Sequence, residues 1–459
     1  MGKPRIVKHM SDNKFYSKFE KKAEPSSSKN QKKNKKDEKS VSKFEKKVSS
    51  HNVSSKSSKQ TQTSSLKYEK TSLFGTTNLD KLSLEILNNF DKIIQGVRPL
   101  NSKQLQQLPQ NIKALSHQLT DERSTRRLGY MNDTIQLSSY VRYYTWWNLV
   151  RLTRLFSNLP SSVFPKKDCT CLDLGSGPLT VVTALWLSRP ELREKKLTWY
   201  CLDVSSNSLS LGEDIYLSVA AKYAKEAWKI IRVKGSFGTS IKQKCNFITS
   251  ANMLNELDQA TTLPPEHQTK KYFEQFLSYA TNDASFLLVE PGVPKAARTL
   301  SLLRDRFISK GKTILSPCPH ALECPMNGFK AYTGSSHKWC NFSFSTTDAP
   351  ERLLSLSQNA KLSKDRATLS FICATASASA STSPQAPFDD DLSIRINSDP
   401  FYLPQEKTGF YGCSKFGLTL VSVSNKQENT FTSGDLIKIK NYKNSQKKDL
   451  KTNATVIEL

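Results

Sequence analysis

Short apolar runs alternate with helical stretches between residues 168 and 295, and this alternation limits the possible folds more than any other feature. Four of the runs read as strands: CTCLDLG, LTWYCLDV, CNFITSANML and SFLLVEPG. Because helical stretches fill the intervals and can serve as crossovers between parallel strands, the pattern predicts a parallel sheet in an α/β domain. We place this Rossmann-type domain at residues 159–312.

The segments before this domain have a different composition. Residues 1–72 are rich in Lys and Ser with few aliphatic side chains, so they cannot bury enough surface to fold and we expect a disordered basic tail. Residues 76–158 carry apolar side chains at three- and four-residue steps, which predicts a helical region. Within it, YVRYYTWWNLVRLTRLF is interpreted as an amphipathic helix packed on the next domain. The alternative is an aromatic and arginine surface for RNA, which would need exposed rings.

The chain after the α/β domain is richer in Cys, Pro and turn residues, and we assign residues 313–440 to a small region of this kind. DLSIRI and GFYGCSKFGLTLVSV in it predict short antiparallel strands. The run at 374–387, ATASASASTSPQAP, is typical of a flexible linker. The Lys- and Asn-rich residues 441–459 are expected to form a loose C-terminal tail.

The chain is strongly basic, with 68 Lys and Arg against 41 Asp and Glu and a formal charge of +27. Residues 1–70 hold 19 Lys and one Arg against seven acidic residues, so the rest of the chain carries about half of the excess. A charge of this size is unusual for an ordinary soluble enzyme and suits a polyanionic partner such as RNA.

Several features of the sequence indicate the cellular compartment in which the protein works. No run approaches the roughly 18 uncharged apolar residues of a membrane-spanning helix, and no apolar leader precedes a cleavage site, so we expect no membrane association. The leader is rich in Lys and contains acidic residues, unlike a mitochondrial presequence, which indicates a bacterial cytoplasmic protein; the mitochondrial matrix is the alternative. Nine cysteines, an odd number at uneven spacings, suit a reducing compartment. We expect a monomer.

A nucleotide-binding turn is predicted in CLDLGSGPLT, where an apolar strand ends in Asp173, Gly175 and Gly177 before a helix. Glycines there let the backbone approach a bound cofactor. The next predicted strand ends in Asp203, whose carboxylate can accept both hydroxyls of a ribose. Thr180 replaces the third glycine of the dinucleotide fingerprint, which favours S-adenosylmethionine over a nicotinamide cofactor. A tight turn without a ligand is the alternative for the glycines alone.

SANMLNEL follows a later strand and brings polar residues to the same sheet edge. Asn255 and Glu256 are the candidates for positioning a methyl acceptor, because transferases often keep polar groups at this place. Asn252 fits either the site or the N-cap of a helix.

Four cysteines form the most distinctive local pattern: Cys318, Cys324 and Cys340 in SPCPHALECP and KWCNF, with Cys413 in FYGCSKFG. Four soft thiolates suit a 4Fe–4S cluster or tetrahedral zinc, and the wide spacing disfavours zinc, which is usually held by C-x2-C knuckles. Either His320 or His337 could replace a sulfur. Five further cysteines lie in strand patterns and are expected in the core: Cys169, Cys171, Cys201, Cys245 and Cys373.

These elements in this order resemble the methyltransferase-like proteins of the mitochondrial small ribosomal subunit and their bacterial relatives. The resemblance spans about residues 125 to 440 and is carried by YVRYYTWWNLVRL, LDLGSGPLT, CLDVS, NMLNEL, LLVEPGVPKAARTLSLLRD, CPHALECP with WCNF, and YGCSKFG. It implies a class I methyltransferase fold of Rossmann type, S-adenosylmethionine binding, a 4Fe–4S cluster and association with the small subunit.

Carried over by position, the resemblance implies that Cys318, Cys324, Cys340 and Cys413 are the cluster ligands. It also implies a cofactor edge at Asp173, Gly175, Gly177 and Asp203. The sequence departs from the family at Leu179, where glycine is common, and at Asn341, where His is usual.

We expect a small-subunit assembly or translation factor that binds rRNA through its basic surface, with a structural metal site. One alternative is an active rRNA methyltransferase that uses Asn255 or Glu256. Another is a redox-responsive RNA-binding regulator whose cluster tunes RNA affinity.

Overall fold

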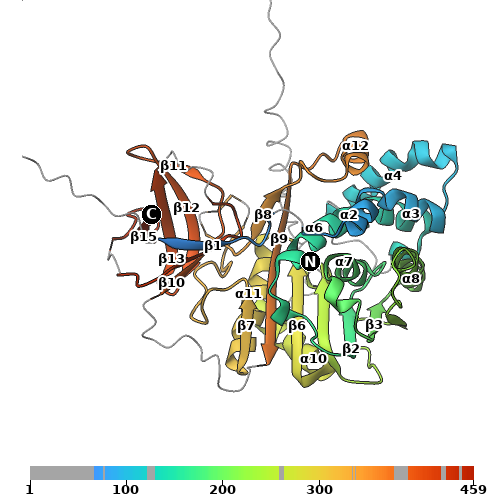
Figure 1. Ribbon diagram of the computed structural model, residues 1–459, viewed down its shortest axis with the longest axis horizontal. Helices are drawn as coiled ribbons and strands as arrows, with labels where there is room; N and C mark the ends of the chain where they lie inside the picture. The colour runs from blue at the N-terminus through green and yellow to red at the C-terminus, as the bar shows by residue number, and fades with distance from the viewer. Residues whose placement is uncertain are drawn as a thin grey trace, which may run out of the picture. The chain divides into compact units, whose positions relative to one another are not determined.

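The computed structural model describes residues 67–75, 78–120, 130–257, 263–332, 334–335, 337–376, 391–424, 431–443 and 447–459 (Figure 1). Residues 1–66 of the predicted disordered tail lie outside the described residues. Residues 377–387 of the predicted linker lie outside them as well.

Among the described residues, eight strands form the central sheet, in the order β4-β3-β2-β5-β6-β9-β7 with β8 paired to β9 (Figure 1). Strands β4, β3, β2, β5 and β6 run parallel, and β9 runs antiparallel to β6 and β7. The strand order reverses between β2 and β5, as in doubly wound folds. The bounds are β2 Cys169–Leu174, β3 Leu197–Asp203, β4 Lys229–Lys234, β5 Cys245–Ala251, β6 Ala280–Glu290, β7 Lys312–Ser316, β8 Phe342–Ser345 and β9 Arg366–Ala376.

The prediction of a Rossmann-like α/β fold is thus confirmed, and β2, β3, β5 and β6 are the four strands that the sequence indicated. These four strands are mostly apolar on both sides, because each face of the sheet is covered by helices. Cys171 and Trp199 belong to the core on one face, while their neighbours Leu172 and Tyr200 belong to the core on the other.

Helices of different parts of the chain cover the two faces. The first face packs against α6 (Trp146–Asn158), α7 (Thr180–Ser188) and α8 (Ser206–Ala220). The second face packs against α10 (Pro265–Tyr279) and α11 (Pro294–Ser309). Short elements complete this part: 3-10 turns η2 Tyr130–Asn132, η4 Ser161–Val163 and η5 Pro190–Leu192, and the helices α9 Leu254–Leu257 and α12 Glu351–Asn359.

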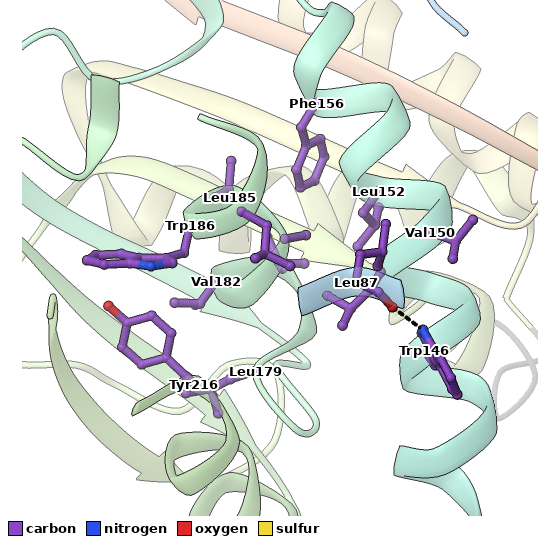
Figure 2. Packing of buried hydrophobic residues seen from close by; sticks show 14 of the residues in the cluster. Leu87, Trp146, Val150, Leu152, Phe156, Leu179, Val182, Leu185, Trp186 and Tyr216 are labelled. Atoms are coloured by element: carbon purple, nitrogen blue, oxygen red, sulfur yellow. Dashed lines mark hydrogen bonds between the residues drawn. The ribbon is translucent and has the colours of Figure 1, made fainter. Parts of the chain in front are cut away.

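The region before the sheet is helical and extends the first face. It holds α2 (Lys81–Asn88), α3 (Phe90–Val97), α4 (Ser102–Thr120) and α5 (Thr134–Tyr140), followed by the π-helical segment η3 (Val141–Thr145). The helix η3–α6 buries its rings, since Tyr143, Trp146 and Trp147 are at most 4% exposed. The interpretation as a packed amphipathic helix is therefore correct. The Trp146 indole N–H donates to the carbonyl of Leu87 at 2.8 Å, which fixes α2 to α6 (Figure 2).

In the described part of the chain, seven strands form a second sheet, in the order β1-β14-β10-β12-β13-β15 with β11 paired to β12 (Figure 1). It has its own apolar core, which includes Ile394, Phe410 and Val421. The bounds are β1 Tyr68–Thr71, β10 Leu392–Ile396, β11 Phe401–Leu403, β12 Lys407–Ser414, β13 Gly417–Ser424, β14 Leu436–Ile439 and β15 Thr455–Glu458.

Two segments of this sheet differ from the sequence-based expectation. Strand β15 lies in residues 441–459, which we expected to be loose, and β1 lies in residues 1–72, which we expected to be disordered. The short apolar stretch of β15 pairs in parallel with β13 and buries Ile457, and β1 pairs with β14. Four paired residues are too few to stand out from polar flanks in a sequence pattern. Across the described residues, no helix has the length and apolar character needed to cross a bilayer.

Candidate functional site

The turn between β2 and α7 takes a conformation that glycine adopts without strain. Gly175 and Gly177 have φ of +65° and +50°, in the left-handed region. A Cβ on Gly175 would lie 2.8 Å from the Cβ of Met253, so a side chain there would collide with the neighbouring loop. Gly177 has more space, because its nearest neighbour would be the Met131 side chain at 3.8 Å. The left-handed backbone favours glycine at both positions, and the lack of space adds a second requirement at Gly175.

Leu179 also has a left-handed backbone, with φ of +53°. This is the position at which the resembled family commonly has glycine, and a leucine there costs about 1–2 kcal/mol of backbone strain. Its side chain is fully buried in the core beside α7, and this burial offsets the cost. The chain therefore keeps the geometry of the turn without the glycine.

Asp203 connects the turn to the end of β3. Its Oδ2 accepts the N–H of Gly177 at 2.9 Å, and its Oδ1 accepts the N–H of Ser205 at 2.8 Å. Burial is the largest influence on this carboxyl group and raises the pKa of Asp203. Each oxygen retains further acceptor capacity, and Asp203 lines the adjoining pocket.

Asp173 lies beneath the turn instead of at the pocket surface. It is fully buried opposite Thr249 of β5, whose hydroxyl donates to its Oδ1 at 2.7 Å. Its Oδ2 has no hydrogen-bond partner, and burial raises the pKa of Asp173 to about 7. Of the four predicted cofactor residues, Gly175, Gly177 and Asp203 line the pocket and Asp173 does not.

The pocket lies at the carboxyl ends of β2, β3 and β5, next to the point where the strand order reverses. It encloses about 870 Å³ of space between atoms, including its open mouth. Tyr140 and Asn148, from the helices before the sheet, line it together with the turn. Sequence reasoning did not assign these two residues to the site, although they belong to the aromatic motif that it singled out. The remaining lining residues are Met131, Leu152, Ser176, Pro178, Thr180, Val181, Leu202, Val204, Gly235, Ser236, Phe237, Ala251, Asn252, Met253, Glu256 and Leu257.

The loop after β5 supplies the polar wall of this pocket. Glu290 caps α9, because its two carboxylate oxygens accept the N–H groups of Leu254 and Asn255 at 2.9 and 3.0 Å. Asn252, for which an N-cap was one interpretation, instead accepts a hydrogen bond from Arg151 at 2.8 Å. Of the two proposed acceptor-positioning residues, Glu256 lines the pocket, whereas Asn255 is buried outside it.

A second cavity gathers the four predicted ligand cysteines. Cys318, Cys324 and Cys340, from the segment between β7 and β8, and Cys413, from β12, all line one small space. His320 lines it as well, and His337 does not. Across the described residues, no group of three or more His, Cys, Asp or Glu side chains is arranged to hold a metal ion.

The surroundings of the four thiols are cationic and largely buried. The Arg304 Nε–H donates to the sulfur of Cys318 at 3.2 Å, and Arg395 also lines the cavity. Burial raises the pKa of Cys324 to about 11, so in the absence of a metal this thiol stays protonated at neutral pH. Neither ring nitrogen of His320 has a hydrogen-bond partner, and burial lowers the pKa of His320 to about 4. Soft sulfur donors with two guanidinium groups nearby fit an anionic metal–thiolate centre.

The other cysteines behave mostly as core residues. Four are buried in strands of the central sheet: Cys171, Cys201, Cys245 and Cys373. Cys169 is partly exposed, and its sulfur lies 3.7 Å from that of Cys171.

The model of one protein family matches the chain. Its description is "Mitochondrial small ribosomal subunit Rsm22", and the match covers residues 151–387, just over half of the 459 residues. This range includes the glycine turn, Asp203, the loop after β5 and the first three cysteines. No curated protein matches the chain.

Solved structures of several methyltransferases are similar to parts of the chain. The ribosomal protein L11 methylase of Lactobacillus delbrueckii subsp. bulgaricus shares 13% identity over 37% of this chain and 69% of its own, with a TM-score of 0.24. The precorrin-6y C5,15-methyltransferase of Geobacter metallireducens shares 10% identity over 56% of this chain and 96% of its own, with a TM-score of 0.28. A methyltransferase of Pyrococcus furiosus shares 15% identity over 34% and 70%, with a TM-score of 0.24.

Proposed function

Because the chain belongs to the Rsm22 family of the mitochondrial small ribosomal subunit, we propose that it is a methyltransferase-like factor for assembly or translation on the small subunit. In this proposal it binds S-adenosylmethionine and rRNA and carries a 4Fe–4S cluster. The observation that carries the proposal is the pocket at the switch point of the sheet, formed by the Gly175–Gly177 turn and Asp203. Ligands of α/β sheets bind at this place.

Support for S-adenosylmethionine comes from the chemistry of the pocket walls. Asp203 keeps acceptor capacity for ribose hydroxyls after its two bonds to backbone N–H groups. Val204 and Phe237, both partly exposed, provide apolar surface for the adenine ring. When bound, the cofactor would supply an activated methyl group, and the chain's residues would orient it.

Direct binding tests this part. Ser236 lines the pocket and is exposed, so Ser236→Trp should fill it without disturbing the core. Ser240→Trp, at an exposed position four residues on and outside the pocket, is the matched control. By calorimetric titration of the full chain with S-adenosylmethionine, we expect at least tenfold weaker binding for the first variant only. Equal affinity for both variants, or no binding by the unaltered chain, would refute the cofactor assignment.

The proposal of rRNA binding is supported by the charge of the chain. About half of the excess positive charge lies outside residues 1–70, so the body of the protein can contribute phosphate contacts. The family description places its members in mitochondria, which favours the matrix over the bacterial cytoplasm that we expected from the leader. The monomeric state stays a prediction.

The proposal of a 4Fe–4S cluster is supported by four thiols at one enclosed cavity with Arg304 and Arg395 beside it. Zinc is the alternative, because four thiolates also hold zinc. Analysis of iron, sulfide and zinc after anaerobic purification decides between the two metals. We expect Cys413→Ala to lose the metal. Cys245→Ala, which changes a buried thiol of β5, is expected to keep it. Protein that contains neither metal would refute the proposal.

An active rRNA methyltransferase is the second candidate, and the position of Glu256 in the pocket favours it. Transfer of labelled methyl groups from S-adenosylmethionine to small-subunit rRNA, lost in Glu256→Gln, would establish this activity. Binding of the small subunit without any transfer would leave the non-catalytic factor.

A further inference from the structure

Residues 326–328 and 338–340 pair as the two arms of a hairpin that begins and ends at the thiol cavity. The Cys340 N–H donates to the carbonyl of Met326 at 2.8 Å, and the Gly328 N–H donates to the carbonyl of Lys338 at 3.2 Å. Asn327 and Trp339 pair as an antiparallel bridge between them. The Trp339 indole donates to the carbonyl of Gly292 at 3.1 Å, which fixes the hairpin to the loop after β6. The base of this hairpin is therefore held on several sides.

The hairpin presents two aromatic rings to solvent. Phe329 is 53% exposed and Tyr332 is 67% exposed. Hydrogen bonds hold the backbone at both: Asn327 Oδ1 accepts the Phe329 N–H at 2.8 Å, and Ser335 Oγ accepts the Tyr332 N–H at 3.1 Å. Large apolar surfaces are costly to leave in water, so two exposed rings three residues apart on an anchored hairpin indicate a binding surface.

The Phe329 ring lies beside two positive charges. The guanidinium carbon of Arg298 and the ammonium nitrogen of Lys330 are each 5.3 Å from the centre of the Phe329 ring. Residues 326–340 also contain His337 and Lys338 and have no Asp or Glu. Arg298 also forms an ion pair with Glu266 at 2.7 Å, so part of its charge is already neutralised. The surface as a whole combines aromatic rings with cations.

We propose that this hairpin is a stacking surface for unpaired RNA bases, with Phe329 and Tyr332 receiving the bases and Lys330 and Lys338 contacting the phosphates. The inference rests on the proposed rRNA binding and adds the surface and the form of RNA. Single-stranded RNA exposes the faces of its bases to such rings, whereas a duplex hides them in its stack. A protein partner held by apolar contacts would be favoured by a wider apolar patch with fewer charges.

The test uses the full chain, a short fluorescent oligouridylate and an RNA duplex of equal length. Phe329→Ala/Tyr332→Ala removes both rings, and Phe329→Tyr/Tyr332→Phe keeps two rings in exchanged positions. Tyr402→Ala is the control, because Tyr402 is 76% exposed and lies in β11, outside the hairpin. Tyr332→Ala alone serves if the double variant has a lowered melting temperature.

We expect the double alanine variant to bind the single strand at least about fivefold more weakly, because base–aromatic stacking has effects of this size. Its affinity for the duplex, and the affinities of the exchanged and control variants, should match the unaltered chain. Unchanged single-strand affinity in the double alanine variant would overturn the inference while leaving the proposed rRNA binding intact. Failure of the unaltered chain to bind either RNA would instead refute the proposed rRNA binding.

One further outcome concerns a protein partner. If the double alanine variant keeps its affinity for RNA and yet no longer sediments with small ribosomal subunits, the hairpin contacts a ribosomal protein, and the RNA inference is overturned.

Discussion

The two glycines of the turn between β2 and α7 allow a comparison of backbone strain with steric collision. Gly177→Ala adds a methyl group with space around it, so only the left-handed backbone should cost stability, by about 1–2 kcal/mol. Gly175→Ala adds the same strain and places its Cβ 2.8 Å from Met253, so overpacking should raise the cost by about 1–3 kcal/mol more. Denaturant unfolding of both variants measures the difference. Equal losses would show that the loop of Met253 moves aside freely.

The buried carboxyl group of Asp173 predicts a pH dependence of stability. Burial raises its pKa from 3.8 to about 7, so between these values the folded protein keeps a proton that the unfolded chain releases. The folded state therefore loses stability as pH rises from about 4 to about 7, and the loss is complete above this window. Asp173→Asn has no charge to bury, so its free energy of unfolding should fall less over the same range.

Unfolding in denaturant at a series of pH values measures this effect. The unaltered protein, measured over the same pH range, gives the reference slope. An Asp173→Asn variant with that same slope would contradict the prediction.

At the scale of elements, helix α6 connects the N-terminal helices to the central sheet, and Figure 2 shows its apolar side chains beside those of α7. Trp146→Phe would leave the buried carbonyl of Leu87 without its 2.8 Å hydrogen bond, at a cost of about 1–3 kcal/mol in addition to lost packing. Trp199 is equally buried, but its indole N–H has no partner. Trp199→Phe should therefore destabilise the protein less, as measured by the midpoint of denaturant unfolding. The reverse order would contradict this view of the helix contact.

The elements that could be predicted are those whose pattern is set by local burial. Strands β2, β3, β5 and β6 are apolar on both faces, and such runs are visible in a sequence. Strand β4, at the edge of the sheet, alternates exposed and half-buried residues among lysines, and no prediction identified it. Strands β1 and β15 depend on partners more than thirty residues away, so their pairing could not be derived from local pattern.

The residues of the candidate cofactor pocket divide in the same way, into those that local sequence patterns predict and those that depend on the tertiary fold. The glycine turn and Asp203 were predicted because strand ends and turn residues are local signals. Tyr140 of α5 and Asn148 of α6 reach the pocket from helices that precede β2, and only the tertiary fold brings them there. Asp173 looked like a ligand by its place in the motif, but its side chain points toward Thr249 in the sheet.

At the scale of the whole molecule, the four thiols at one cavity come from two parts of the chain, the second sheet and the segment after β7. Direct contacts already join these parts: the Arg395 guanidinium of β10 donates to the carbonyl of Pro317 at 2.9 Å, and Arg366 of β9 pairs with Asp399. Cys413 is the one predicted ligand that lies in the second sheet. A metal centre bound to all four sulfurs would therefore cross-link two parts that fold around separate cores.

The proposed metal centre predicts how the protein would respond to removal of that metal. Removing the metal by chelation, or replacing Cys413 by Ala, should speed amide hydrogen exchange in β10, β12 and β13, because a constraint on these strands is released. Exchange in β2 and β5 should stay unchanged, since these strands are held by the helices on both faces of the central sheet. Cys245→Ala removes a buried thiol of β5 and should leave exchange in the second sheet as it is. The second sheet of the Cys413→Ala variant could instead exchange as slowly as that of the metal-loaded protein. That result would show that the thiols do not join the two parts. The contacts of Arg395 and Arg366 would then hold the parts together.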